Sequence, residues 1–251
     1  MSSLRNAALA VGGLAVVLLL WMVNPWVDVP AGLERIVAVA FWILSIALVA
    51  ILYVDARRNP QADDVEIEGP AFARFLFNNS RAGLFWLPIR LFIGFEWLEA
   101  GWHKVSGPGW LDGGAALAGF WKGAAAVPAG GRPPITYEWY RDFITFLLNG
   151  HHQTWFAPLV AFGELAIGLG LIFGALTGVA AFFGAFMNMS FLLAGSASTN
   201  PIMFTAAIGL ILAWKVAGYY GVDRYLLPRL GTPWRPGTVL GRPRQQAPLR
   251  T

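Results

Sequence analysis

Long apolar runs constrain the fold of this chain more than any other feature of its sequence. A helix that crosses the hydrocarbon core of a bilayer needs about 20 consecutive apolar residues. Six stretches approach this length: Ala7–Val23, Ile36–Val54, Leu84–His103, Trp155–Phe173, Val179–Ala194 and Ile202–Tyr220. The sequence therefore predicts an all-α membrane protein with six transmembrane helices.

The composition excludes an ordinary soluble domain. Hydrophobic residues make up 57% of the chain and charged residues only 13%, whereas soluble proteins carry about 25% charged residues. The formal charge of +4 does not indicate nucleic-acid binding, because the basic residues flank apolar runs and do not line a polar face. The chain has no cysteine, which excludes disulfides, thiolate metal sites, iron–sulfur clusters and covalently attached haem.

The first apolar stretch is interpreted as a retained membrane anchor. It exceeds the roughly 7–15 residues of a signal-peptide core, and no A-x-A-like cleavage site follows it.

The distribution of basic residues predicts the orientation. Eleven basic residues are expected on one side of the membrane: Arg5, Arg57, Arg58, Arg74, Arg81, Arg224, Arg229, Arg235, Arg242, Arg244 and Arg250. The other side receives Arg35, Lys104, Lys122, Arg132 and Arg141. Because cytoplasmic loops carry an excess of Lys and Arg, we expect a multi-pass membrane protein with both termini in the cytoplasm.

Four regions are expected along the chain. Residues 1–60 form a two-helix transmembrane hairpin, and residues 61–83 form a polar cytoplasmic loop. Residues 84–228 form a four-helix transmembrane domain, which includes an outer segment at 104–154. Residues 229–251 form a disordered basic tail. The outer segment is rich in Trp and Tyr, rings that favour the headgroup zone, so we expect it to form an interfacial helical cap.

The third apolar stretch contains an unusual set of ionisable residues. At about 100° per residue, Glu96, Glu99 and His103 lie within about 60° of one another on one helical face. An ionisable side chain inside a span costs a few kcal/mol on insertion scales, so this stripe needs partners or a cavity. We expect the three residues to handle protons or bind a ligand near the outer surface. The alternative is that they form interhelical ion pairs or reach the outer interface.

Other polar residues of the spans suggest contacts between helices. Glu164 lies near the middle of the fourth stretch, and Arg90 is its expected ion-pair partner because both lie within the bilayer. This pair is either a structural salt bridge or part of a quinone or proton pathway. Asn188 is expected to form an interhelical hydrogen bond or to bind a ligand. Gly94 and Gly101 mark the opposite side of the third span, where another helix can approach closely.

Three segments of the chain resemble the DoxX/DoxD family of small bacterial and archaeal membrane proteins, and the resemblance implies a bacterial or archaeal inner membrane. They are RLFIGFEWLEAGWHKV (Arg90–Val105), GELAIGLGLIFGALTG (Gly163–Gly178) and GYYGVDRYLLP (Gly218–Pro228), and WLDGGAALAGFW after the third span is similar to DoxD-like members. The likeness covers about Phe85–Pro228 and implies a DoxX-like four-helix bundle. The hairpin that precedes it is an N-terminal addition.

The resemblance implies a membrane subunit of a thiosulfate:quinone oxidoreductase. In that enzyme thiosulfate is oxidised to tetrathionate outside the membrane, and a membrane quinone takes up the electrons. By motif match, the resemblance assigns a catalytic role to Glu99 and substrate or quinone binding to Arg90, Lys104 and Glu164. It also implies a second membrane or periplasmic subunit on a separate chain.

Two functions remain open on the sequence. In the first, quinone is a diffusible substrate, and Glu96, Glu99 and His103 relay the protons that its reduction requires. In the second, the protein is a non-catalytic scaffold or assembly subunit of a larger respiratory or photosynthetic complex. Neither function involves nucleic acid, and both are compatible with a homo-oligomer. We expect no haem, flavin, metal or iron–sulfur cluster, because the sequence lacks their ligands and motifs.

Overall fold

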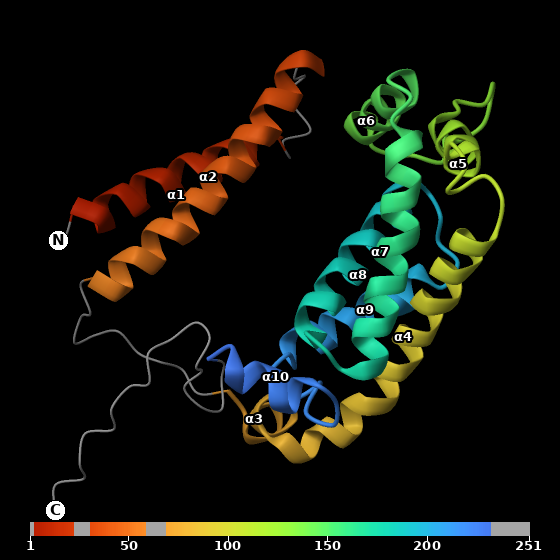
Figure 1. Cartoon of the computed structure of the whole chain (residues 1–251). Coiled ribbons are helices and arrows are strands. Elements are labelled where there is room, and N and C mark those ends of the chain that lie inside the picture. The colour runs from red at the N-terminus through yellow and green to blue at the C-terminus, as the bar shows by residue number, and fades with distance from the viewer. Residues whose placement is uncertain (1–2, 23–30, 59–68, 232–251) are drawn as a thin grey trace, which may run out of the picture. The chain divides into compact units, whose positions relative to one another are not determined.

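The computed structural model describes residues 3–22, 31–58 and 69–231, which are helical apart from their connections (Figure 1). The chain divides into two compact units, Met1–Glu68 and Gly69–Thr251. In the described ranges the chain forms ten α-helices and one short 3-10 helix, which confirms the predicted all-α class. The basic tail predicted at 229–251 lies almost wholly outside these ranges.

The first unit is a helical hairpin, as the sequence predicts. Helix α1 (Ser3–Met22) packs against α2 (Ala31–Arg58). Gly12 of α1 lies close to Leu48 of α2, where an added Cβ atom would meet the leucine side chain at 3.4 Å. Most apolar side chains of α2 are exposed within the unit, which is the pattern of a helix that faces lipid.

The second unit is built around four helices. They are α4 (Gly83–Ser106), α7 (Gln153–Phe173), α8 (Thr177–Leu193) and α9 (Asn200–Leu212). The most extensive packing joins α4 to α7 and α8 to α9. Among the described residues, two helices are long and apolar enough to cross a membrane, namely α7 and the part of α2 over Ile36–Asp55. Helix α4 is also long, but its charged residues lower its hydropathy.

Glycines determine how closely α4 and α7 approach. A Cβ atom on Gly101 would lie 2.6 Å from the backbone nitrogen of Leu165, and one on Gly168 would lie 2.5 Å from that of Leu98. Gly94 faces Ile172 in the same way, so the close approach predicted at Gly94 and Gly101 is confirmed. These contacts run antiparallel, with the start of α4 beside the end of α7.

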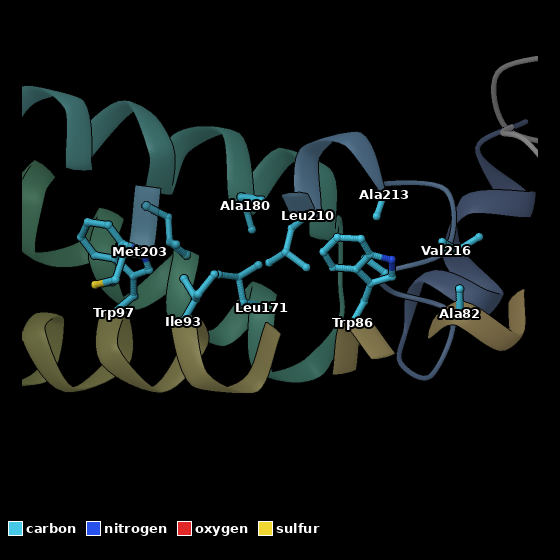
Figure 2. Close-up of a cluster of buried hydrophobic side chains, with 13 residues drawn as sticks. Ala82, Trp86, Ile93, Trp97, Leu171, Ala180, Met203, Leu210, Ala213 and Val216 are labelled. Atoms are coloured by element: carbon cyan, nitrogen blue, oxygen red, sulfur yellow. The ribbon is translucent and has the colours of Figure 1, made fainter. Parts of the chain in front are cut away.

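An apolar core fills the space between the four helices. It runs from Ala82 and Trp86 at one end to Trp97 and Met203 at the other (Figure 2). Ile93, Leu171 and many small residues lie between these ends. The small side chains of α8 and α9 let the helices approach without leaving voids, which is common where helices pack within membranes.

Two short helices cover the end of the bundle at which α4 finishes, here called the cap end (Figure 1). They are α5 (Ala115–Ala125) and α6 (Glu138–Asn149). Trp121 and Tyr140 are buried in a small core of the cap. Tyr137, Trp139 and Trp155 are exposed. The predicted cap is therefore helical, and only some of its aromatic residues are available to an interface.

The opposite end of the bundle, here called the tail end, differs from the prediction in two places. The loop predicted at 61–83 contains a helix, α3 (Ala71–Asn78), followed by the 3-10 helix η1 (Ser80–Ala82). The span predicted over Ile202–Tyr220 ends earlier, because α9 stops at Leu212 and tight turns follow up to α10 (Asp223–Arg229). These turns place the backbone of Tyr220 beside α4, where its carbonyl oxygen accepts a hydrogen bond from Arg90.

Candidate functional site

A cavity of about 330 Å³ lies at the cap end of the second unit. Its walls come from α4, α5, α7, α8, α9 and the α8–α9 loop. The polar lining includes Glu96, Lys104, Glu164 and Asn188, four of the seven residues proposed from the sequence. The volume falls within the range of small-molecule sites, which typically combine apolar walls with a few polar groups.

An ion pair between α4 and α7 forms one wall of the cavity. Lys104 Nζ lies 2.7 Å from Glu164 Oε2. The Glu164 side chain is 1% exposed and that of Lys104 18% exposed. Lys104 Nζ also lies 5.0 Å from the centre of the Trp110 ring, so it makes a cation–π contact.

Asn188 of α8 presents an amide group with no partner. Its side chain is fully buried and lines the cavity. Neither Nδ2 nor Oδ1 has a hydrogen-bond partner in the described part of the chain, so the interhelical hydrogen bond expected from the sequence is not formed. An unsatisfied buried polar group costs about 1–3 kcal/mol, and a polar ligand in the cavity would remove that cost.

The polar stripe predicted on α4 divides between two environments. Glu96 lines the cavity. Glu99 and His103 lie outside it, 3.7 Å apart, with side chains that are 53% and 74% exposed. The sequence placed all three within about 60° of one another, and that angle is wide enough for neighbouring helices to enclose one residue and leave the next exposed.

The prediction that Arg90 forms an ion pair with Glu164 is wrong. In the antiparallel register of α4 and α7, Gly94 faces Ile172 and Gly101 faces Leu165. Arg90 therefore lies beside the end of α7 at Gly174, about 15 Å of helix away from Glu164. Lys104 lies about 21 Å further along α4 than Arg90. It is therefore Lys104, and not Arg90, that pairs with Glu164.

Arg90 instead belongs to a second charged centre at the tail end. Its Nη2 atom donates a hydrogen bond to the carbonyl oxygen of Tyr220 at 3.1 Å, and its charge is attracted by the carboxylate of Asp223. Asp223 accepts backbone hydrogen bonds from Leu176 at 2.6 Å and Thr177 at 2.9 Å, and so caps the start of α8. Neither Arg90 nor Asp223 lines the cap-end cavity.

Sequence reasoning missed several residues at both centres. Trp97 lines the cavity and is 3% exposed, with an indole nitrogen that has no partner in the described chain. Nothing in the sequence distinguished Trp97 from the many other tryptophans of the chain. Ser198, in the α8–α9 loop, also lines the cavity with a φ of 39°, which is uncommon for a residue other than glycine. Asp223 stood in the family-like segment GYYGVD, and that signal could have found it.

Comparison with known families agrees with this architecture. Residues 85–195 match the model of the DoxX family. The chain carries a DoxX family domain. The domain includes nearly all of α4 and the whole of α5 to α8, and therefore Glu96, Lys104, Glu164 and Asn188. It ends before α9, so Asp223 lies outside the match. No curated protein and no solved structure matches the chain significantly.

Proposed function

We propose that this DoxX family membrane protein is an integral subunit of a quinone-linked redox system, in which thiosulfate oxidation supplies the electrons. The observation that carries the proposal is the cap-end cavity, where an ion pair, a free carboxylate and an unpartnered amide line one chamber. Six transmembrane spans, with both termini in the cytoplasm, would place this chamber near the outer surface.

The chemistry of quinone reduction suits this lining. A quinone takes up two electrons and two protons to become a quinol, while two thiosulfate ions lose two electrons to become tetrathionate. The protons must come from a group that contacts the quinone head. Glu96 lines the cavity, and in the described chain its carboxylate has no ion-pair or hydrogen-bond partner, so it is the group best placed to transfer a proton.

The Lys104–Glu164 pair has a different part in this proposal. Both residues are held at the cavity wall by their mutual attraction across α4 and α7. A buried charge whose partner is lost is costly, so the pair keeps the two helices in register and maintains the shape of the chamber. Exposed basic residues of the outer segment, Lys122 and Arg132, would attract the sulfur anion outside the bundle.

The experiment compares two glutamates on the same helix. Glu96→Gln removes the proton donor inside the cavity, whereas Glu99→Gln changes an exposed carboxylate outside it. In membranes that contain the full chain and its native partners, thiosulfate-dependent reduction of decylubiquinone should fall at least about 100-fold for Glu96→Gln, the lower end of general acid catalysis. Glu99→Gln should stay close to the wild type.

Protein yield and melting temperature are measured alongside, because they separate chemistry from folding. The proposal requires Glu96→Gln to accumulate normally and to melt close to the wild type. If activity is the same in both variants and in the wild type, Glu96 does not deliver the proton. If no thiosulfate-dependent activity accompanies the wild-type protein at all, the non-catalytic scaffold is the better description.

A further inference from the structure

The wall of the cavity also carries two buried polar groups that the proposed proton transfer does not use. Trp97 of α4 and Asn188 of α8 both line the chamber. They are 3% and 0% exposed, and neither the indole Nε1 nor the amide has a hydrogen-bond partner in the described residues. Native proteins leave few such groups unpaired, and each one calls for an explanation.

The surroundings of Trp97 hold its ring in place. A Cβ atom on Gly184 of α8 would lie only 3.0 Å from Trp97 Nε1, so the indole edge packs directly against the backbone of α8. Asn188 follows Gly184 by one helical turn on the same face. The glycine therefore lets the indole lie next to the amide, and the two groups come from different helices.

The charges at the cavity decide which kind of ligand these groups can meet. The carboxylates of Glu96 and Glu164 face the chamber, and the only lysine in its lining is Lys104. Lys104 is already engaged by Glu164 at 2.7 Å. The N-terminus of α9, which begins at Asn200, adds only about half a positive charge. When Glu96 is ionised, an anion entering the chamber would meet an excess of negative charge.

We infer that Trp97 and Asn188 bind the oxygen atom of an uncharged aromatic carbonyl compound, and that the chamber excludes inorganic anions. The inference rests on the proposed function and deepens it, because it identifies the residues that select the ligand and separates the quinone site from the thiosulfate site. Trp97 supplies a donor only, while the Asn188 amide can donate to the same carbonyl through Nδ2. The apolar residues Leu117, Phe120 and Met203 contact the ring of the ligand.

The test uses two probes with the full chain in lipid nanodiscs. Decylubiquinone is a reducible quinone, and xanthone is a neutral aromatic ketone that is hard to reduce. Equilibrium dialysis measures the dissociation constant of each. Trp97→Phe keeps an aromatic ring but removes the N–H donor. It should raise the dissociation constant of both probes about tenfold, as expected for one lost hydrogen bond. Asn188→Leu should weaken them to a similar extent.

Trp86→Phe is the matched control. Trp86 is also a buried tryptophan of α4 and belongs to the same apolar core (Figure 2), but its Nε1 donates to the carbonyl oxygen of Leu76 and it does not line the cavity. This variant suffers a comparable loss of packing and should bind both probes like the wild type. Gly184→Ala is a second variant that keeps the indole but displaces it, and it should also weaken binding.

Each outcome distinguishes the inference from the proposed function. If decylubiquinone binds equally well to Trp97→Phe and Trp86→Phe, the inference fails and the quinone function stands. If xanthone binding depends on Trp97 but decylubiquinone does not bind, the inference stands and the quinone function fails. Failure of both probes to bind the wild type overturns the inference. Competition by sodium thiosulfate at millimolar concentration overturns the exclusion of anions.

Discussion

The two ends of the DoxX bundle each contain a buried charged centre, but the centres are built differently. At the cap end, Lys104 and Glu164 pair beside a cavity of about 330 Å³. At the tail end, Arg90 and Asp223 are enclosed by backbone. A Cβ atom added to Gly174 or to Gly221 would collide with the Arg90 guanidinium, so the backbone packs closely against this group.

This difference shows that buried charge alone does not identify a functional site. Both centres contain polar atoms without partners, including Nε and Nη1 of Arg90 at the tail end and the Asn188 amide at the cap end. The cap-end groups line the cavity described above, and Arg90 and Asp223 do not. The tail-end centre joins α4, the α7–α8 turn and the chain before α10, so its role is to hold these segments together.

The largest expected effect is the loss of Asp223. Asp223→Leu removes the counter-charge of a fully buried Arg90 and the cap of α8, so it should lower the free energy of unfolding by about 3–5 kcal/mol. Unfolding of the purified protein by SDS in mixed micelles measures this change. Asp112→Leu, at an exposed position of the outer segment, is the control and should change stability by less than about 0.5 kcal/mol.

If Asp223→Leu is as stable as Asp112→Leu, Arg90 does not depend on the carboxylate, and the contrast between the two ends disappears.

The next effect concerns the partner of Glu164. Lys104→Met and Glu164→Leu should each cost about 3 kcal/mol, the low end for a broken buried pair, because Lys104 is partly exposed. The double variant should recover more than about 1 kcal/mol relative to the sum of the two, since contacting residues are coupled. The same SDS unfolding measures all three proteins.

Arg90→Met combined with Glu164→Leu is the comparison pair. Because these residues belong to different ends of the bundle, their effects should add within about 0.5 kcal/mol. Strong coupling between Arg90 and Glu164 would contradict the antiparallel register described here.

The smallest effect concerns the attachment of the cap. Tyr140 of α6 donates a hydrogen bond from its hydroxyl to the carbonyl oxygen of Ser190, at 2.9 Å. Tyr140→Phe should therefore lower the free energy of unfolding by about 1 kcal/mol. Tyr137→Phe changes an exposed ring and should have no measurable effect.

The pH dependence of this contribution follows from the environment of the phenol. Burial raises the pKa of Tyr140 above its usual value of 10.0. The folded state thus favours the neutral phenol, and its stabilising contribution is present below pH 10. Above that pH the unfolded chain ionises first, so stability should fall as pH rises. A Tyr140→Phe protein that lost stability to the same extent would show that another group is responsible.

Much of the helical architecture could be predicted from the sequence, because apolar length and glycine placement act locally. Each predicted span overlaps a helix of the described chain, and Gly94 and Gly101 mark the face of α4 that meets α7. The short helix α3 was missed because it is only eight residues long and lies in a polar segment. The sixth span was predicted too long because hydropathy does not register the turns that carry Tyr220 to Arg90.

The sequence by itself determined which residues must be compensated, since a charge inside an apolar helix is costly wherever the helix lies. Together with the resemblance to DoxX/DoxD proteins, it singled out seven residues, and the fold brings four of them to one cavity: Glu96, Lys104, Glu164 and Asn188. Only the tertiary structure decided the partners, because pairing depends on the register of two antiparallel helices. In that register Lys104 pairs with Glu164, and the charge of Arg90 is attracted by Asp223. The spacing of residues along a single helix does not contain this information.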